Sequence, residues 1–427
     1  MSVPAPITDG DFLTFAEGWA EAGQLLFFDP VLSGNKNIAC ATCHHPTLAT
    51  GDAMSLSIGE GGLGLGTERV PVADNMPGER IPRNAPALFN LGAREFSVMF
   101  HDGRVERDAA SPFGIRMPEG RTLPAHVPAP LSAQNILPIL SPAEMSGQPG
   151  ENEVADAVAA ENITGPDGAW AILTQRIDEI PAYAEAFDAL IGTERDLQIT
   201  DIATALSAFI THEFRATESK FDLALRGDAV MSSDETEGLL LFYGKANCAT
   251  CHSGPFLTDH RFHAIGMPQL GPGKSKGDAA YRDSGRGMVT GDYEDDYRFR
   301  TPSLRNVALT APYGHNGAYT ELEEMIRHHL DPKTALDAYT ESKATLHALE
   351  VEGDDYAAMK DAEEVERIRE ASEITPVTLT DEEVDQILAF LNTLTDDTPL
   401  TGRLGVPASV PSGLPLDPVS ASVNKGF

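Results

Sequence analysis

The sequence predicts a mainly α-helical protein, built from two related domains with long irregular loops and an extended C-terminal tail. The pentapeptide Cys-Ala-Thr-Cys-His occurs twice in the 427 residues, at 40–44 and at 248–252. Apolar residues recur at helical spacing in several segments, whereas the alternation typical of strands is scarce. We therefore expect each half of the chain to repeat one arrangement, in which a helix leads into the pentapeptide.

Helical patterns lead into both pentapeptides. Before the first, apolar residues at helical spacing begin at Phe12 and continue through Phe15 and Trp19 to Leu26. Before the second, a similar pattern runs over 239–243. It follows two candidates for a helix N-cap, Ser232 and Ser233.

A second pair of helices closes the two halves. Apolar residues mark one helix near 200–215, and Thr380 with Glu383 forms a capping box before an apolar face that extends to Leu394. Segments 55–86 and 264–300 are rich in glycine and charge and predict loops. We divide the chain into an N-terminal extension (1–19), an N-terminal domain (20–225), a C-terminal domain (226–397) and an extended tail (398–427).

The pentapeptides contain all four cysteines of the chain, which are Cys40, Cys43, Cys248 and Cys251. C-x-x-C-H is the attachment signal for c-type haem, with thioethers to the two thiols and iron bound by the histidine, here His44 and His252. A structural zinc site would need the two distant pairs to converge and would leave both histidines unexplained, and a redox disulfide has the same difficulty. The sequence therefore predicts two covalently bound c-type haems in two cytochrome c-type domains.

The charge and the apolar content of the chain exclude some classes of protein. The net charge is −34, from 65 acidic and 31 basic residues. Such a charge serves solubility, adaptation to salt or the steering of a basic partner, and it would repel nucleic acid. The sequence contains no run of 18 or more apolar residues, so we expect no membrane-spanning helix. Residues 1–4 lack the basic and apolar regions of a secretory signal. Because c-type haem is attached outside the bacterial cytoplasm, we expect a periplasmic protein whose leader is not part of this sequence.

From about residue 20 to 396 the chain resembles the bacterial di-haem cytochrome c peroxidases, which include the MauG-type enzymes that oxidise protein side chains. The resemblance rests on both pentapeptides and on ordered landmarks, which are Leu26-Phe27-Phe28-Asp29-Pro30, Arg83-Asn84-Ala85-Pro86, His101-Asp102-Gly103-Arg104, Pro142-Ala143-Glu144-Met145, Thr301-Pro302-Ser303-Leu304-Arg305-Asn306 and Pro312-Tyr313-Gly314-His315-Asn316-Gly317. It implies a peroxide site at the N-terminal haem and an electron-transfer haem in the C-terminal domain. Members of the family are often homodimers.

The resemblance also assigns the groups around the N-terminal haem. Glu144 matches the carboxylate that moves a proton between the two peroxide oxygens, and Gln134 and Pro138 match distal-pocket positions. Many relatives close this haem with a histidine sixteen residues after the motif histidine, and here that position is Glu60. We expect an open or water-bound iron at this haem, and we expect Glu60 to be a solvated loop residue.

At the C-terminal haem, the resemblance places His329 where the peroxidases carry methionine and MauG carries tyrosine. Helical spacing supports this choice, because His329 shares one face with Leu322, Met325 and Ile326, whereas His328 is rotated away. Ligation by two histidines lacks the thioether that raises the potential, so we expect a haem of lower potential than in methionine-ligated relatives.

Further residues match positions between the domains. His101 replaces the tryptophan that relays electrons between the haems of relatives, and we expect it to be a poorer relay or a partner of a haem propionate. Asn84, Thr310 and Pro312 match the family's Ca²⁺ ligands, through one side-chain oxygen and two backbone carbonyls. His315 is expected to bind a propionate or the backbone.

The resemblance thus implies a peroxidase that reduces H₂O₂ to water with electrons relayed through the second haem. A small electron-donor protein, a cytochrome c or a cupredoxin, would supply them. Two alternatives stay open. A MauG-like oxidase would use peroxide to modify a side chain of a protein substrate, and a plain di-haem electron carrier would not react with peroxide.

Overall fold

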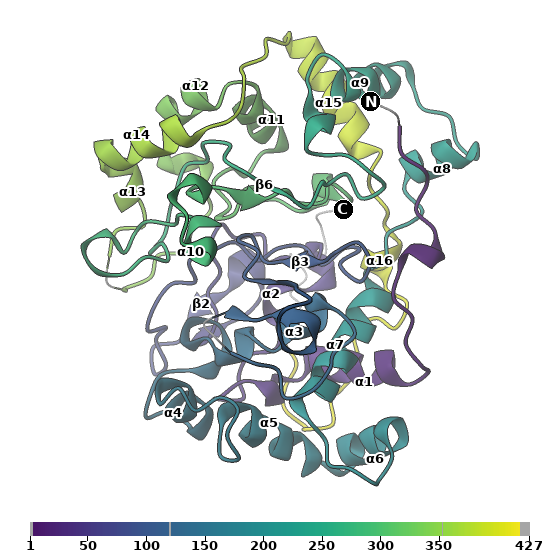
Figure 1. Cartoon of the computed structure of the whole chain (residues 1–427), viewed down its shortest axis with the longest axis vertical. Helices are drawn as coiled ribbons and strands as arrows, with labels where there is room; N and C mark the ends of the chain where they lie inside the picture. The colour runs from purple at the N-terminus through teal and green to yellow at the C-terminus, as the bar shows by residue number, and fades with distance from the viewer. Residues whose placement is uncertain (1–2, 119–120, 352, 419–427) are drawn as a thin grey trace.

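The computed structural model describes residues 3–118, 121–351 and 353–418, and it is mainly helical, as predicted. Figure 1 shows two halves, one above the other, each built around its own helices. The helices of the N-terminal half are α1 (Trp19–Phe28), α2 (Cys40–Cys43), α3 (Pro130–Asn135), α4 (Glu153–Ala159), α5 (Ala169–Asp178), α6 (Pro181–Ile191) and α7 (Ile199–Glu213). Those that follow are α8 (Lys220–Arg226), α9 (Ser233–Tyr243), α10 (Gly287–Thr290), α11 (Leu322–Leu330), α12 (Pro332–Asp337), α13 (Ala357–Lys360), α14 (Ala362–Ala371), α15 (Asp381–Asn392) and α16 (Thr398–Thr401).

The strands are short, antiparallel and confined to the loop regions. The first two form one antiparallel pair within the N-terminal half, the next three form a small sheet, and the last two join loops of the C-terminal half. They are β1 (Gly62–Leu63), β2 (Val70–Pro71), β3 (Val98–Met99), β4 (Val105–Arg107), β5 (Ile115–Arg116), β6 (Phe262–His263) and β7 (Phe299–Arg300). Most of the chain that surrounds the two pentapeptides is therefore irregular.

Each half is organised by one close helix crossing. In the N-terminal half α1 lies against α7, and a Cβ on Gly23 would come within 1.9 Å of the carbonyl of Ala205. In the C-terminal half α9 lies against α15, and a Cβ on Gly238 would come within 1.8 Å of the carbonyl of Gln386. No side chain fits at either contact, so glycine is required for both crossings. Neither glycine is marked by a sequence pattern, although both precede an apolar run.

Several predicted helix signals are confirmed. The helix predicted near 200–215 is α7. Ser232 accepts a hydrogen bond from the backbone N–H of Glu235 at 3.2 Å and begins α9. Thr380 and Glu383 form the predicted capping box at the start of α15.

The prediction that a helix begins at Phe12 is wrong for the first turns of the pattern. Helix α1 begins only at Trp19, because Gly18 before it has a left-handed backbone with φ of 91°. Phe12 lies in an extended bridge with Ala93, and its ring packs edge-on against Phe256 at 5.9 Å. Its apolar character reflects this contact with a distant loop of the C-terminal half.

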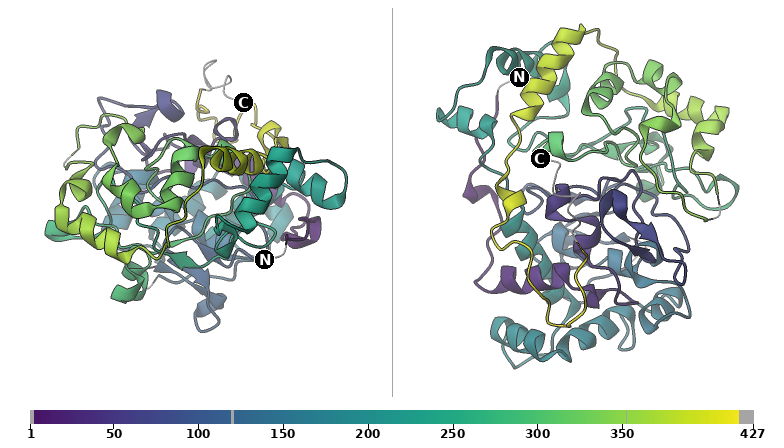
Figure 2. Two further views of the ribbon diagram at one scale, coloured as in Figure 1. Left: turned by 90° about the horizontal axis from the view of Figure 1, so that it is seen from above. Right: turned by 180° about the vertical axis from the view of Figure 1, so that it is seen from behind.

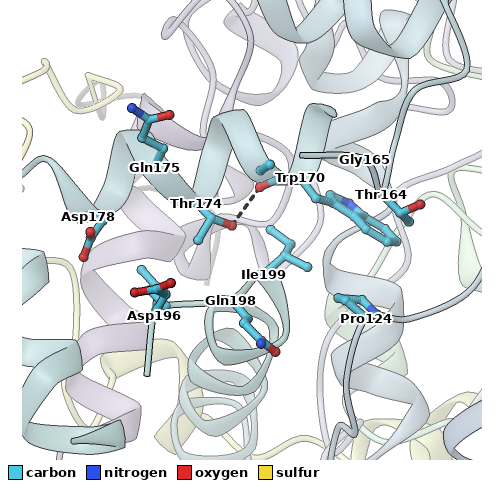
Figure 3. A pocket seen from close by; sticks show the side chains of 12 residues that line it. Pro124, Thr164, Gly165, Trp170, Thr174, Gln175, Asp178, Asp196, Gln198 and Ile199 are labelled. Atoms are coloured by element: carbon cyan, nitrogen blue, oxygen red, sulfur yellow. Dashed lines mark hydrogen bonds between the residues drawn. The ribbon is translucent and has the colours of Figure 1, made fainter. Parts of the chain in front are cut away.

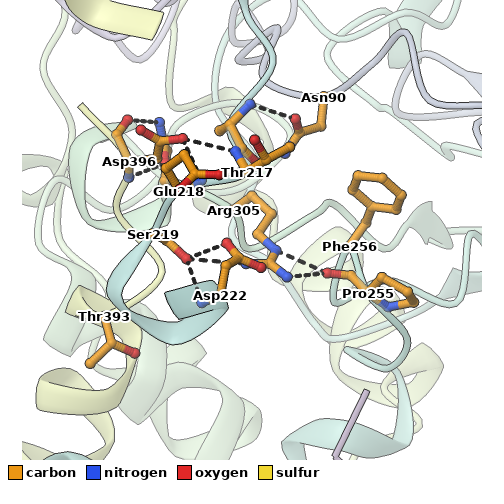
Figure 4. Close-up of polar contacts among 12 residues, drawn as sticks. Asn90, Thr217, Glu218, Ser219, Asp222, Pro255, Phe256, Arg305, Thr393 and Asp396 are labelled. Atoms are coloured by element: carbon orange, nitrogen blue, oxygen red, sulfur yellow. Dashed lines mark hydrogen bonds and ion pairs between the residues drawn. The ribbon is translucent and has the colours of Figure 1, made fainter. Parts of the chain in front are cut away.

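Side chains fix the connection between the two halves (Figure 4). Asn90 of the N-terminal half donates to the carbonyl of Ala216 at 3.1 Å and accepts from the N–H of Ala216 at 2.8 Å. Asp396, just after α15, accepts from the backbone N–H groups of Thr217 at 2.8 Å and Glu218 at 2.9 Å. The connecting segment is therefore held from both sides.

A buried ion pair reinforces this junction (Figure 4). Arg305 donates to Asp222 at 2.8 Å, and the exposed fractions of the two side chains are 1% and 0%. The same guanidinium donates through Nε to the carbonyl of Pro255 at 2.9 Å. Loss of one partner from a buried pair costs about 3–5 kcal/mol, so this contact fixes α8 to the loop after the second pentapeptide. Phe221 on α8 packs in the core of the C-terminal half.

The C-terminal segment crosses from one half to the other. After α15 the chain passes through α16 and runs back across the N-terminal half, as the yellow trace in the right panel of Figure 2 shows. Part of the predicted tail, 398–401, is thus helical, and the described residues from 402 to 418 contain neither helix nor strand. Among the described residues, no helix is long and apolar enough to cross a membrane.

Candidate active site

The first pentapeptide lies on the single helical turn α2. Cys40 and Cys43 begin and end this turn, and His44 caps it. The Nδ1–H of His44 donates to the carbonyl of Thr50 at 2.9 Å, which leaves Nε2 with its lone pair. Burial lowers the pKa of His44 and keeps the imidazole neutral, the form that binds a metal. The turn therefore offers two thiols and one imidazole nitrogen.

The second pentapeptide repeats this arrangement in a 3-10 turn over Cys248–Thr250. The Nδ1–H of His252 donates to the carbonyl of Leu257 at 3.1 Å, so Nε2 is again free to bind a metal. Burial and the neighbouring His329 lower the pKa of His252 to about 4. The donor sets of both pentapeptides thus fit c-type haem, with a neutral proximal imidazole at each.

The structure brings His329 to face His252. Their ring centroids lie 6.3 Å apart. With metal–imidazole bonds of about 2.0–2.1 Å, two rings on opposite sides of one metal have centroids about 6 Å apart. The Nδ1–H of His329 donates to the carbonyl of Met325 at 2.9 Å, which leaves its Nε2 free as well. The pair fits a haem held between two imidazoles.

The neighbouring His328 has both ring nitrogens engaged. Its Nε2–H donates to the carbonyl of Ile265 at 2.8 Å, and its Nδ1 accepts from the hydroxyl of Tyr319 at 3.0 Å. His328 therefore anchors α11 to the protein and has no lone pair left for a metal.

The residues predicted for the peroxide pocket lie on three consecutive turns. Gln134 is near the end of α3, Pro138 begins a 3-10 turn (Pro138–Leu140), and Glu144 lies in a π-helical turn (Pro142–Ser146). All three side chains are half-buried, whereas most of their neighbours in the segment are fully buried. Burial raises the pKa of the Cys43 thiol, and Asp52 and Glu144 raise it further, which places the Glu144 carboxylate near the first pentapeptide.

Glu60 is buried, although the sequence predicts a solvated loop residue. Its side chain is 2% exposed and accepts from the amides of Asn35 at 2.9 Å, Asn37 at 2.7 Å and Asn75 at 2.7 Å. The expectation is wrong because these partners come from two other loops, around 35–37 and at 75, and spacing along the chain does not reveal that they meet. The backbone N–H of Glu60 also donates to the carbonyl of Glu144 at 3.0 Å. Glu60 thus holds the turn that carries Glu144, a role that the sequence analysis missed.

Cationic and imidazole groups gather between the two halves. The Arg300 guanidinium donates to the carbonyls of Phe100 at 3.1 Å and Thr301 at 3.3 Å, and burial lowers its pKa to about 10. His315 stacks on Phe299 at 3.7 Å, and among the described residues neither of its ring nitrogens has a hydrogen-bond partner. Haem carries carboxylate groups, so a guanidinium bonded only to carbonyls and an unpartnered buried imidazole fit its propionates.

His101 lies beside these groups. Its Nε2–H donates to the carbonyl of Asn84 at 3.3 Å. Burial, together with Arg83 and Arg300, lowers the pKa of His101 to about 4, so its ring is neutral at ordinary pH. The imidazole is therefore fixed to the backbone between the two halves.

The residues matched to Ca²⁺ meet at the same interface. The side-chain NH₂ group of Asn84 donates to the carbonyl of Met54 at 2.8 Å. The side-chain oxygen of Asn84 therefore points away from that carbonyl. The backbone N–H of Asn84 donates to the carbonyl of His315 at 2.9 Å, in the turn that follows Thr310 and Pro312. The segments that carry the three oxygens are therefore adjacent.

Two other features lie outside this arrangement. A surface cavity of 360 Å³ between α5 and the start of α7 is lined by Trp170, Thr174 and Ile199, and it contains no predicted site residue (Figure 3). Ligand atoms of Cys251, Asp259 and His263 lie within 4.8 Å of one another, a spacing that suits a metal. Because Cys251 is a thioether once haem is attached, this trio offers no thiolate in the haem-bound protein.

Comparisons with known proteins identify the family of the chain. The model of the di-haem cytochrome c peroxidase family matches residues 17–230. The chain is 30% identical over 312 residues to the methylamine utilization protein MauG of Methylorubrum extorquens, covering 72% of this chain and 67% of that protein. It is 30% identical over 309 residues to the cytochrome c551 peroxidase of Nitrosomonas europaea, covering 72% and 71%.

Solved structures share the fold. A MauG-like protein associated with microbial copper homeostasis aligns with a TM-score of 0.59 and 25% identity, over 94% of this chain and 96% of that one. The di-haem peroxidase BthA of Burkholderia thailandensis aligns with a TM-score of 0.60 and 22% identity, over 95% and 91%. The two motifs and these matches show that the chain belongs to the di-haem cytochrome c peroxidase family, whose members are oxidoreductases acting on peroxide.

Proposed function

We propose that this protein reduces H₂O₂ to water at its N-terminal haem, with electrons relayed through its C-terminal haem. The difference between the two haem sites carries this proposal. His252 is faced by His329, whereas in the described part of the chain no second imidazole ring pairs with His44. The position of the family's closing histidine holds Glu60, whose carboxylate is occupied by three amides. A peroxide-reducing haem needs an open face, and the lack of a facing imidazole among the described residues supports one at this site.

The residues of the chain supply binding and proton transfer. When bound, the haem held by Cys40, Cys43 and His44 supplies the electrons, and reduction of one H₂O₂ to two waters takes two electrons and two protons. The carboxylate of Glu144 takes the proton from the peroxide oxygen nearer to the haem. It delivers this proton to the oxygen farther from the haem, which leaves as water. The amide of Gln134 can hydrogen-bond the peroxide, and the rigid ring of Pro138 limits access to it.

A specific observation favours a second candidate, a MauG-like oxidase that modifies a side chain of a partner protein. This chain lacks the closing histidine and carries His329 where the peroxidases carry methionine. The relatives in the comparisons bear both names, MauG and cytochrome c peroxidase. His101, a poorer relay than tryptophan, argues against the rapid sharing of oxidising equivalents that such an oxidase needs.

Peroxide turnover with a protein donor separates these candidates. We expect sustained consumption of H₂O₂ when a reduced small basic cytochrome c or cupredoxin is present, because the charge of −34 steers a basic donor to the surface. Negligible turnover with such donors, together with a mass change in a partner protein after peroxide treatment, would establish the oxidase instead. A carrier without enzyme activity would show neither result. Osmotic-shock fractionation should recover the protein with the periplasm, where c-type haem is attached.

We also propose that Asn84, Thr310 and Pro312 hold Ca²⁺ between the two halves, because their segments are adjacent and offer oxygen ligands. Removal of Ca²⁺ by EGTA should lower the melting temperature, and added Ca²⁺ should restore it. At a Ca²⁺ concentration of about 100 times Kd the bound ion adds about 2.7 kcal/mol of stability.

Asn84→Ala should abolish this response to EGTA. Asn392→Ala, which alters an exposed amide at the end of α15, should retain it. An unchanged melting curve in EGTA, with no calcium found by elemental analysis, would refute the site.

A further inference from the structure

The described C-terminal residues 402–418, here named the C-terminal strap, are docked on the N-terminal half (Figure 2). Leu404, Leu414 and Leu416 pack against the core of that half. Val410 is 6% exposed. The strap is therefore part of the packed structure over most of its length.

Two buried carboxylates of the N-terminal half hold the backbone of the strap. Glu213 accepts from the N–H groups of Leu404 and Gly405, both at 2.8 Å. Asp29 accepts from the hydroxyl of Ser412 at 2.6 Å. The exposed fractions of Glu213 and Asp29 are 1% and 0%. Charge-assisted bonds in such surroundings give the strap a fixed path.

This path ends at the first pentapeptide. The hydroxyl of Thr42, between Cys40 and Cys43, donates to the carboxylate of Asp417. The same hydroxyl accepts from the N–H of Ala39 at 3.0 Å, so the contact is continuous with the turn that carries the thiols. Burial raises the pKa of Asp417, whereas the Thr42 hydroxyl and the charge of Arg69 favour its ionised form.

The second pentapeptide has the same sequence and provides a comparison within one molecule. Thr42 is fully buried beneath the strap, whereas Thr250 is exposed. The nearby carboxylate of Asp259 pairs with His263 at 2.9 Å. Because the two pentapeptides are identical, the buried hydroxyl–carboxylate contact at the first comes from the strap and not from the motif.

A fixed negative charge beside a redox centre favours its more positive, oxidised state, most strongly where water is partly excluded. We propose that the C-terminal strap is a positioning element of the N-terminal haem. Through Thr42, Asp417 holds the turn that bears the two thioethers, and its negative charge lowers the reduction potential of that haem. The proposal rests on haem attachment at Cys40 and Cys43, and it holds whether the enzyme reduces peroxide or oxidises a partner.

Two variants of the haem-bound protein separate charge from contact. Asp417→Asn keeps a hydrogen-bond acceptor for Thr42 but removes the charge. It should raise the potential of the N-terminal haem and leave that of the C-terminal haem unchanged in a spectroelectrochemical titration. Thr42→Val keeps the charge but removes the hydroxyl, and it should increase hydrogen–deuterium exchange over residues 40–44.

Thr250→Val is the matched control, and it should change neither potential. An unchanged N-terminal potential in Asp417→Asn, or equal shifts at both haems, would overturn the electrostatic role. Unchanged exchange over 40–44 in Thr42→Val would overturn the positioning role. These readouts do not use turnover, so they remain informative if the proposed activity is absent.

Discussion

Replacing Glu144 with glutamine should slow the reaction with peroxide by about 10²–10⁴-fold, the range that positioned acid–base groups contribute. Glutamine keeps the shape of the side chain but cannot accept the proton of the nearer peroxide oxygen. The turn that carries Glu144 is held through the backbone of this residue, since its N–H donates to the hydroxyl of Ser141 at 3.3 Å. The turn should therefore persist in the variant, and the loss should appear in the rate alone.

Stopped-flow mixing of the ferric protein with H₂O₂ measures this rate directly. Glu153→Gln is a suitable control, because Glu153 is a solvent-exposed carboxylate on the same stretch of chain, at the start of α4. It should react as the unmodified protein does. A Glu144→Gln variant with an unchanged rate would remove Glu144 from the mechanism and move the search for the base to another carboxylate or a bound water.

Replacing His329 with alanine should convert the C-terminal haem from low-spin to high-spin. The imidazole that faces His252 is the only ring that the described structure pairs with that histidine. Without this ring, His252 would be the one imidazole left to hold the haem. In the resting ferric EPR spectrum the low-spin signal should disappear, and the high-spin signal should grow to account for both haems.

A further variant tests the potential of this haem. His329→Met would restore the thioether of the peroxidases and should raise the potential of the C-terminal haem. His347→Ala is the control, since the ring of His347 meets the carbonyl of Gly66 at 3.4 Å and its removal should leave the spectrum unchanged. A persistent low-spin signal in His329→Ala would show that another group binds this iron.

The sequence was most informative where the signal is local. The two pentapeptides, the capping box at Thr380 and the N-cap at Ser232 each lie within a few residues, and the structure shows these features where they were predicted. Periodicity also placed His329 and Met325 on one face of α11. It could not say that His328 would be held by Tyr319 and Ile265, yet this contact is what leaves His329 to face His252.

The sequence was least informative where partners come from distant segments. Glu60 is expected to be solvated, because its neighbours in the sequence give no sign of the three asparagine amides that bind its carboxylate. Phe12 fits a helical pattern but packs on Phe256, more than half the chain away. The glycines at the two helix crossings add nothing to the apolar periodicity. Their role is to leave room, by having no side chain, for two helix backbones to meet.

The contact between Asp417 and Thr42 joins residues 375 positions apart. The contact can form only when nearly the whole chain is present, so closure of the strap over the first pentapeptide depends on residues that follow the second. A chain shortened to end before residue 402 would keep both haem-binding motifs and lose this contact.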